Sequence, residues 1–373
     1  MGAQDKLTLR PLGLWDPAEG EAAEGPRRLL AGGPLSFGHC EAVLRSDQGL
    51  RRAALSLPAI EAWAEEQTPG LGAEAAAILQ RLSSPRGSLG GLTLERPRIM
   101  GILNITPDSF SDGGDRFDPE VAVRDGLAML EEGADILDVG GESTRPGAAA
   151  ISLEEERARV LPVVKGLVQA GACVSIDTRH AAIMQDAVAA GAAMINDVTA
   201  LAGDPDSLAV AAAAEVPVIL MHMQGEPRTM QQDPRYRHVA LDIYDYLAER
   251  LEACAAAGIA LERLVVDPGI GFGKTVAHNL QLLEQIAVFH GLGCPVLLGA
   301  SRKSFIARLS HGEAPKDRLP GSLAAVLFAL QRGVQILRVH DVAETAQAVA
   351  VWQAMMQAPS GFGATDKGHR ALV

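Results

Sequence analysis

The stretch VVDPGIGFGKT, residues 265–275, decides between the folds that this 373-residue chain could adopt. Two glycine-rich nucleotide-binding patterns come close to matching it. The P-loop pattern requires glycine where Pro268 stands, five positions before Gly273, and the dinucleotide pattern G-x-G-x-x-G requires glycine in place of Lys274. Both patterns fail by one residue. The stretch is instead an apolar run that ends in Asp267 and a tight loop, as in a buried strand of a parallel sheet.

Short apolar runs that end in polar residues recur along the chain after residue 90. The eight runs are RIMGILN (98–104), ADILDVGG (134–141), CVSIDT (173–178), AMIND (193–197), VPVILMH (216–222), RLVVDP (263–268), PVLLGAS (295–301) and QILRVHD (335–341). Stretches typical of helices separate them; one of these begins with Asp118 as its N-cap and Pro119 at its first position. The pattern predicts an α/β fold, a (β/α)8 TIM barrel. A doubly wound open sheet is the alternative, less favoured because no glycine-rich nucleotide loop follows the first run.

A cluster of Ser, Pro and Gly at residues 83–91 marks a boundary between two parts of the chain. We predict a small N-terminal α+β extension of unknown role over residues 1–84, the barrel over residues 85–358, and a flexible tail over residues 359–373. In the extension, LTLRPLGLW and GGPLSFGHCEAVLR are predicted to form strands, and LPAIEAWAEEQ and AEAAAILQRL to form helices.

Composition excludes several classes of partner. The formal net charge of −13 would repel nucleic acid and anionic membranes. The N-terminus has no apolar signal core, and no uncharged apolar run is long enough to span a bilayer, so we predict a cytoplasmic protein. The cysteines form no C-x-x-C pair, which leaves zinc and redox motifs unsupported. All four are expected to be small buried apolar residues in a reducing compartment: Cys40, Cys173, Cys254 and Cys294.

Polar residues follow the predicted strands, and in a barrel of this kind the C-terminal strand ends carry the active site. Asp177, Asn196 and Asp267 end near-continuous apolar runs, so their side chains should lie partly buried at the barrel mouth. A buried carboxylate needs hydrogen-bond donors. An aminopyrimidinone ring, with adjacent N–H and NH₂ groups, supplies two donors to one carboxylate. Lys303 could donate to a nitrogen or carbonyl of the same ring.

A second group of strand-end residues fits an anion. Arg338 and His340 stand two positions apart on the last predicted strand, so their side chains lie on the same side. Together with Thr144 and Arg145, in a loop flanked by Gly and Pro, they offer donors to phosphate oxygens. Asn104 could complete a Mg²⁺ shell made mostly of water and phosphate oxygens.

Other strand-end residues are predicted to support the site. Asp197 is expected to cap or brace a loop, Arg302 to form a structural ion pair, and Asp341 to orient a neighbour or cap a helix. His222 could line the site or lie in the core, and support is the favoured interpretation. Met221 is expected to be an apolar contact for a flat ring.

The motifs taken together resemble the dihydropteroate synthase family, the sulfonamide targets of folate biosynthesis. The resemblance is carried by MGILNITPDSFSDGG, DVGGESTRPGA, SIDT, MIND, MHMQGEPRTMQ, DPGIGFGK, SRKSF and GSLAAVLFALQRGVQILRVHD, in this order, from about residue 86 to about residue 356. Residues 1–84 lie outside it.

The resemblance implies that the chain condenses 6-hydroxymethyl-7,8-dihydropterin diphosphate with 4-aminobenzoate to give 7,8-dihydropteroate and diphosphate. It implies pterin contacts from Asp177, Asn196, Met221, Asp267, Lys303 and Arg338. The resemblance implies that diphosphate contacts Asn104, Thr144, Arg338 and His340. Asn104 would also bind Mg²⁺. The aminobenzoate would be framed by Phe110, Arg145, Pro146, Phe272 and Ser304. The family also implies a homodimer, and loops around TPDSFSDGGD and GESTRPGAAA that close over bound substrate.

The charges of these residues predict how the reaction proceeds. Mg²⁺, Arg338 and His340 would stabilise the departing diphosphate, and Asp177 and Asp267 would favour a cation developing on the pterin. We therefore predict a dissociative, S_N1-like substitution from which closed loops exclude water. The sequence also predicts that Arg338→Ala and Lys303→Ala leave the fold intact and reduce turnover severely.

Two other functions share part of the pattern. A methyltetrahydrofolate-binding methyltransferase domain would have the same barrel and the same pterin-binding Asp/Asn set. It would not need Lys303 or the Arg338/His340 pair, because no diphosphate leaves. A catalytically silent pterin-binding protein would be expected to have lost a strand-end group, and none is missing.

Overall fold

The computed structural model describes residues 5–14, 26–105, 118–143, 151–226 and 229–358. In this part of the chain, an eight-stranded parallel sheet matches the eight predicted runs. Its strands are β6 (Arg98–Asn104), β7 (Ile136–Gly140), β8 (Val174–Asp177), β9 (Met194–Asp197), β10 (Val218–Met221), β11 (Leu264–Asp267), β12 (Leu297–Leu298) and β13 (Ile336–Val339).

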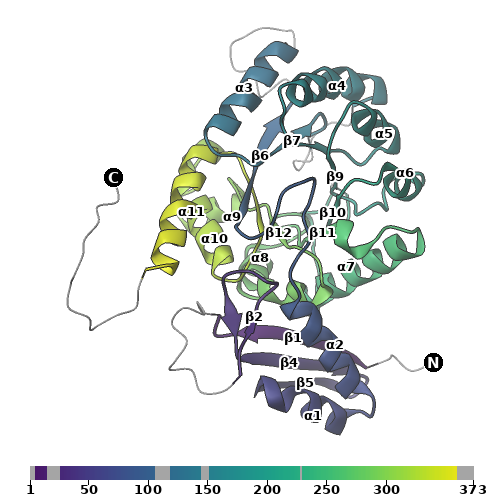
Figure 1. Ribbon diagram of the computed structural model, residues 1–373, viewed down its shortest axis with the longest axis vertical. Coiled ribbons are helices and arrows are strands. Elements are labelled where there is room, and N and C mark those ends of the chain that lie inside the picture. The colour runs from purple at the N-terminus through teal and green to yellow at the C-terminus, as the bar shows by residue number, and fades with distance from the viewer. Residues whose placement is uncertain (1–4, 15–25, 106–117, 144–150, 227–228, 359–373) are drawn as a thin grey trace, which may run out of the picture.

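The sheet curls into a barrel (Figure 1). Its strand order is β11-β10-β9-β8-β7-β6-β13-β12, so strands that follow one another along the chain are neighbours, and β6 also pairs with β13. An isolated parallel bridge between Val266 and Val296 joins the two end strands. The predicted TIM barrel is therefore confirmed, and the open-sheet alternative is excluded.

Helices separate the barrel strands and cover the outside of the barrel (Figure 1). They are α3 (Pro119–Glu131), α4 (Leu153–Gln169), α5 (Ala181–Ala189), α6 (Ser207–Ala214), α7 (Val239–Ala256), α8 (Val276–Glu284), α9 (Ser304–Leu309), α10 (Leu319–Leu330) and α11 (Val342–Met356). The Asp118 side chain accepts a hydrogen bond from the Glu120 N–H, as predicted for an N-cap. The sequence analysis did not predict α9 or α11.

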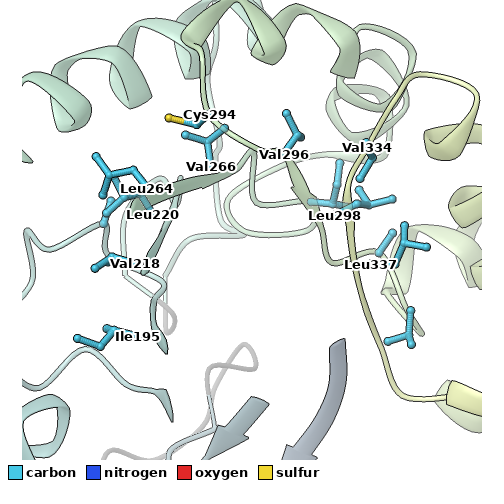
Figure 2. Packing of buried hydrophobic residues seen from close by; sticks show 14 of the residues in the cluster. Ile195, Val218, Leu220, Leu264, Val266, Cys294, Val296, Leu298, Val334 and Leu337 are labelled. Atoms are coloured by element: carbon cyan, nitrogen blue, oxygen red, sulfur yellow. The ribbon is translucent and has the colours of Figure 1, made fainter. Parts of the chain in front are cut away.

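Two apolar layers hold the barrel together. The larger lies between the strands and the helices, and Figure 2 shows part of it, including Leu220, Val266 and Leu298. The smaller fills the interior at the N-terminal end of the strands. There Met100, Ile136 and other strand residues pack around Leu89, which lies in the linker between α2 (Leu71–Ser83) and β6, residues 84–97. Since this end is closed by apolar side chains, the opposite end is the one open to polar groups.

The N-terminal extension forms a separate sheet-and-helix unit below the barrel in Figure 1. An antiparallel sheet in the order β1-β4-β5 contains β1 (Lys6–Leu12), β4 (His39–Ser46) and β5 (Gly49–Ser56). Helices α1 (Leu57–Gln67) and α2 (Leu71–Ser83) lie where the sequence predicts them, and β5 was not predicted. A short hairpin of β2 (Arg28–Leu29) and β3 (Ser36–Phe37) completes the unit.

The four cysteines are free thiols in the structure. Cys40, Cys254 and Cys294 are buried as expected, but the prediction was wrong for Cys173, which is half-buried beside the linker. In the described part of the chain, no helix combines the length and apolar character that crossing a membrane requires.

Candidate active site

One guanidinium joins two acids at the mouth of the barrel. Arg338 on β13 donates from Nε to Oδ2 of Asp138 and from Nη2 to Oδ2 of Asp177, each over 2.6 Å. Asp138 lies on β7 and Asp177 at the end of β8, so three strands meet in this contact. Such charge-assisted hydrogen bonds fix the plane of the guanidinium as well as its position. The structure therefore brings together the predicted residues Asp177 and Arg338.

Asp138, which the sequence analysis did not predict as a site residue, accepts hydrogen bonds from both Arg338 and Asn196. Its side chain is fully buried, and the same Oδ2 also accepts a 2.9 Å hydrogen bond from Nδ2 of Asn196 on β9. The amide of Asn196 is thereby oriented, with its oxygen on the side opposite to Asp138. Asp138 Oδ1 and the Ser175 hydroxyl, on register-paired residues of β7 and β8, have no hydrogen-bond partner among the described residues. The sequence signal for Asp138 was an acidic residue within an otherwise apolar run, ILDVG.

Two glycines leave space between these polar side chains. A Cβ at Gly140 would lie 3.4 Å from Oδ2 of Asp177, and one at Gly299 would lie 3.8 Å from Oδ2 of Asp267 and 3.9 Å from Cβ of Arg338. Positions 140 and 299 thus face the barrel interior, where a TIM barrel is normally filled by branched side chains. Neither position carries a side chain among these acids.

Asp267 and the loop after it are locked together by backbone contacts. Oδ1 of Asp267 accepts a 2.7 Å hydrogen bond from the Gly269 N–H. Gly269 has a φ of +70°, and a Cβ there would lie only 1.9 Å from the His222 carbonyl oxygen. No residue other than glycine fits this approach. The loop therefore serves to hold Asp267 and to pass close to β10, rather than to cradle a phosphate.

The aromatic and apolar side of the site adjoins this loop. Nζ of Lys303 lies 4.0 Å from the centre of the Phe272 ring, a cation–π contact. Phe272 belongs to a buried cluster with Met221. Ser304 begins α9 directly after Lys303 and is exposed.

The end of β13 is braced by two side-chain contacts. The Ser301 hydroxyl accepts a 3.2 Å hydrogen bond from the His340 N–H and lies 3.0 Å from Nδ1 of the same residue, which holds the imidazole in one orientation. Arg302 pairs with Asp341, as predicted for a structural ion pair. Asn104 ends β6 and is register-paired with Gly140 on β7.

Four predicted ligand contacts lie outside the described residues: Phe110, Thr144, Arg145 and Pro146.

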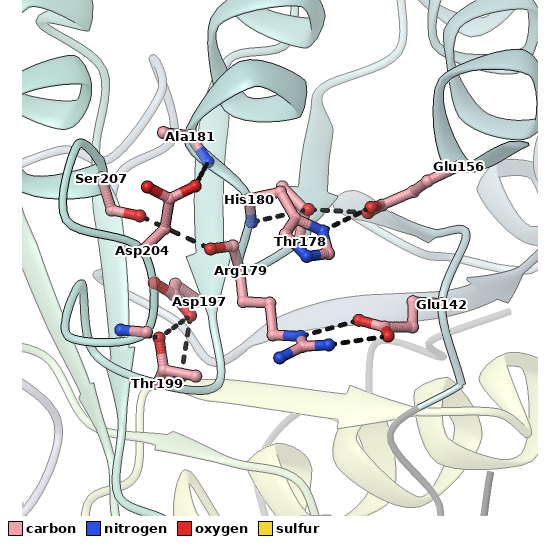
Figure 3. Close-up of polar contacts among 11 residues, drawn as sticks. Glu142, Glu156, Thr178, Arg179, His180, Ala181, Asp197, Thr199, Asp204 and Ser207 are labelled. Atoms are coloured by element: carbon pink, nitrogen blue, oxygen red, sulfur yellow. Dashed lines mark hydrogen bonds and ion pairs between the residues drawn. The ribbon is translucent and has the colours of Figure 1, made fainter. Parts of the chain in front are cut away.

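A second polar network braces the ends of β8 and β9 (Figure 3). Arg179 donates to both carboxylate oxygens of Glu142 over 2.9 Å, and the buried Glu156 carboxylate accepts from Thr178 and meets His180 at 2.7 Å. Asp197 accepts hydrogen bonds from the Thr199 N–H and hydroxyl and from the Leu201 N–H. The predicted supporting role of Asp197 is confirmed.

Burial and charge control the protonation of the central acids. Burial raises the pKa of Asp177 to about 7; Arg338 opposes this shift, and Asp138 adds to it. Burial likewise raises the pKa of Asp267, against a hydrogen bond from Gly269 and the charge of Lys303. Burial alone would lower the pKa of Arg338, but Asp138 and Asp177 raise it above its ordinary value. The Arg338 guanidinium therefore stays charged, and additional hydrogen-bond donors would stabilise the ionised form of the acids.

Comparisons with known proteins agree with this arrangement. The family described as pterin binding enzyme matches residues 100–340. The dihydropteroate synthase of Escherichia coli strain K12 is 47% identical over 268 residues, which are 72% of this chain and 94% of the relative. The chain belongs to the dihydropteroate synthase family. Its function is accordingly the predicted one: it is a transferase that condenses a dihydropterin diphosphate with 4-aminobenzoate.

Solved dihydropteroate synthases share the barrel. The Xanthomonas albilineans enzyme with 4-aminobenzoic acid is 51% identical, with a TM-score of 0.69 over 74% of this chain and 99% of that one. The same enzyme in complex with 7,8-dihydropteroate gives 49% identity and a TM-score of 0.66, over 72% and 97% of the two chains. Membership of the dihydropteroate synthase family excludes the methyltransferase domain as a description of this chain.

Proposed function

We propose that the pterin ring lies among Asp177, Asn196, Asp267 and Lys303, with Arg338 beside it, in the space that Gly140 and Gly299 leave open. The observation that carries this proposal is the joint contact of Arg338 with Asp138 and Asp177. One cation between the buried Asp138 and the half-buried Asp177 leaves a negative excess, which the N–H donors of an aminopyrimidinone ring offset. Met221 supplies an apolar surface for the ring.

The orientation of Asn196 supports this assignment. Its NH₂ group is engaged by Asp138, so its oxygen is the atom that can accept from the ring. The unpartnered Oδ1 of Asp138 is a further acceptor directed away from Arg338 Nε and Asn196. Asp138 is on this proposal a residue that positions Arg338 and Asn196.

The diphosphate is proposed to lie beside Arg338 and His340, with Thr144 as a further donor. Asn104 fits a Mg²⁺ ion in its donor chemistry, because Mg²⁺ prefers oxygen ligands and keeps several waters and phosphate oxygens. When bound, the ion would neutralise charge on the departing diphosphate. Arg338 donates to the same oxygens, and Ser301 keeps the His340 ring in place.

The aminobenzoate is proposed to occupy the side of the site formed by Phe272 and Ser304, together with Phe110, Arg145 and Pro146. Its amine needs no deprotonation before it attacks the pterin methylene. The harder step is the departure of diphosphate, and acids beside the ring favour positive charge on it. We therefore infer a dissociative, S_N1-like substitution.

A secondary isotope effect tests this mechanism. With deuterium on the pterin methylene, a dissociative transition state should give a rate ratio clearly above one, because the carbon approaches trigonal geometry. A ratio near one, measured under conditions where chemistry limits turnover, contradicts the inference.

Asp267→Asn should weaken pterin binding by about 10- to 100-fold, which corresponds to the loss of a hydrogen bond to a charged group. The amide oxygen of the variant side chain would still accept the hydrogen bond from the Gly269 N–H. The NH₂ group, which cannot accept a hydrogen bond, would then face the N–H donors of the pterin ring. Isothermal titration calorimetry measures the change. The exposed Asp317→Asn is the matched control, and binding of wild-type strength by Asp267→Asn would remove Asp267 from the proposed site.

Pterin affinity should increase as the pH rises through about 7. The pKa of Asp177 is raised to about 7, so the carboxyl is protonated below this pH and becomes a full acceptor above it. A pterin without diphosphate is the suitable ligand, because phosphate groups titrate in the same range. Calorimetry between pH 6 and pH 8 that finds a constant affinity would contradict the role of Asp177.

A homodimer and a cytoplasmic location, which the sequence analysis also expects, stay predictions.

A further inference from the structure

Lys274, from the stretch that fails as a P-loop, is a buried cation with no role in the site as described so far. Only 2% of the residue is exposed. A buried ammonium group is costly unless acceptors surround it. Its contacts therefore indicate what the residue does.

Three acceptors surround the amine. Nζ of Lys274 lies 2.9 Å from the Phe272 carbonyl oxygen, 3.1 Å from Nδ1 of His222 and 3.5 Å from the His222 carbonyl oxygen. An ammonium group has three N–H donors. Lys274 thus connects the glycine-rich loop, at Phe272, to the residue that follows β10.

The rest of the loop is fixed from other directions. The Gly271 N–H donates to Asn279 over 2.8 Å, and the Tyr236 hydroxyl donates to the Gly273 carbonyl over 2.8 Å. Gly271 also lies against the side chain of Lys303, since a Cβ there would be 3.1 Å from Cδ of Lys303. Because Gly271 and Gly273 are held by these contacts, loss of the Lys274 contact should be felt mainly at Phe272 between them.

The charges around Lys274 agree with a structural task. Burial lowers its pKa to about 7; Asp267 opposes this shift and Lys303 adds to it. Burial, together with the charge of Lys274, lowers the pKa of His222 to about 2, so the imidazole is neutral and its Nδ1 can accept. His278 on α8 also faces this group, and its pKa is lowered by burial and by Lys274.

We propose that Lys274 is a positioning residue that holds Phe272 and the glycine-rich loop against His222 and so shapes the aminobenzoate side of the site. The inference rests on the proposed contact between Phe272 and aminobenzoate. It assigns no contact with substrate to Lys274.

Lys274→Met in the full chain tests the inference, because methionine fills similar space without donors. The KM for 4-aminobenzoate should rise about tenfold, as expected when a binding group is slightly displaced. The kcat and the KM for the pterin diphosphate should stay within about twofold of wild type. The exposed Lys165→Met is the matched control. A lower melting temperature with unchanged KM values, or a loss confined to kcat, overturns the inference.

His222 provides a second test that does not depend on the folding of Lys274→Met. His222→Asn offers an amide oxygen near the place of Nδ1, whereas His222→Leu offers no acceptor. The Leu variant should reproduce the tenfold rise in KM for 4-aminobenzoate, and the Asn variant should restore most of the wild-type value. Equal KM values in the two variants overturn the inference.

Phe272→Ala separates failure of the inference from failure of the proposed site. If Phe272→Ala raises the KM for 4-aminobenzoate and Lys274→Met does not, the positioning role of Lys274 alone is wrong. If Phe272→Ala leaves this KM unchanged, the assignment of Phe272 to the aminobenzoate side is wrong as well.

Discussion

Arg338→Met in the full chain should reduce the rate of dihydropteroate formation by about 10²- to 10³-fold, the usual effect of removing a donor that stabilises a developing anion. Arg338 contacts both Asp138 and Asp177 and is also proposed to reach the diphosphate. Its loss would misplace the acids and remove a cation in a single change. A steady-state assay of diphosphate release measures the rate, and a rate within tenfold of wild type would contradict the assignment.

The same variant should also be less stable. From sequence alone, Arg338→Ala is expected to leave the fold intact, but the structure shows the guanidinium between the buried Asp138 and the half-buried Asp177. Removing one member of a buried ion pair typically costs about 3–5 kcal/mol in the free energy of unfolding. Protonation of the acids, whose tendency is visible in the raised pKa of Asp177, would recover part of this loss.

A double variant separates the two effects. Arg338→Met combined with Asp138→Asn removes one uncompensated charge and should recover part of the stability lost in the single variant. It should not restore the rate, because the donor to diphosphate is still missing. Recovery of activity in the double variant would mean that the single change acts through stability alone. Urea unfolding and the diphosphate assay together decide the matter.

Removal of residues 1–84 should cause the second large effect, a loss of cooperative folding at 37 °C or a melting temperature lower by at least about 10 °C. We propose that the N-terminal unit supports the barrel from one side. The segment Ile286–Leu292 is entirely buried, and the unit covers it. Nε of Arg81 on α2 donates to the Gly291 carbonyl over 2.6 Å, and Ile78 packs against the same glycine.

Ion pairs add to this contact at the edge of the unit. Arg45 on β4 donates to both oxygens of Asp245 on α7, over 2.8 and 2.6 Å, and Arg10 on β1 donates to Glu284 over 2.6 Å. Partly exposed pairs contribute little each, so the apolar contact should dominate.

Point variants make the truncation test sharper. Ile78→Asp places a charge against Gly291 without removing the unit, and it should lower the melting temperature in the same direction as the deletion. Arg51→Asp, on the exposed strand β5, is a control that should leave the melting temperature near that of wild type. A chain starting at Pro85 with wild-type stability and activity would show that the unit does not support the barrel.

The local sequence determined the strands and their ends. Continuous apolar runs that stop at a polar residue predict buried parallel strands, and all eight formed where expected. Because the C-terminal ends of these strands meet at one face, the ligand candidates Asp177, Asn196, Asp267 and Arg338 could be named before any contact was known. The motifs around them also pointed to the correct family. All of these signals are short-range and can be read within about ten residues.

The tertiary structure alone decided which of these groups contact each other. Arg338 and Asp138 are 200 positions apart, and only the pairing of β6 with both β7 and β13 brings them together. Asp138 lies within an apolar run, and Lys274 lies in a loop that does not match the P-loop pattern, so neither is predicted to be functional from sequence. Both become important through burial, since a charge removed from water must find partners, and those partners come from distant strands. Periodicity places a side chain on a face, but closure of the barrel selects its neighbours.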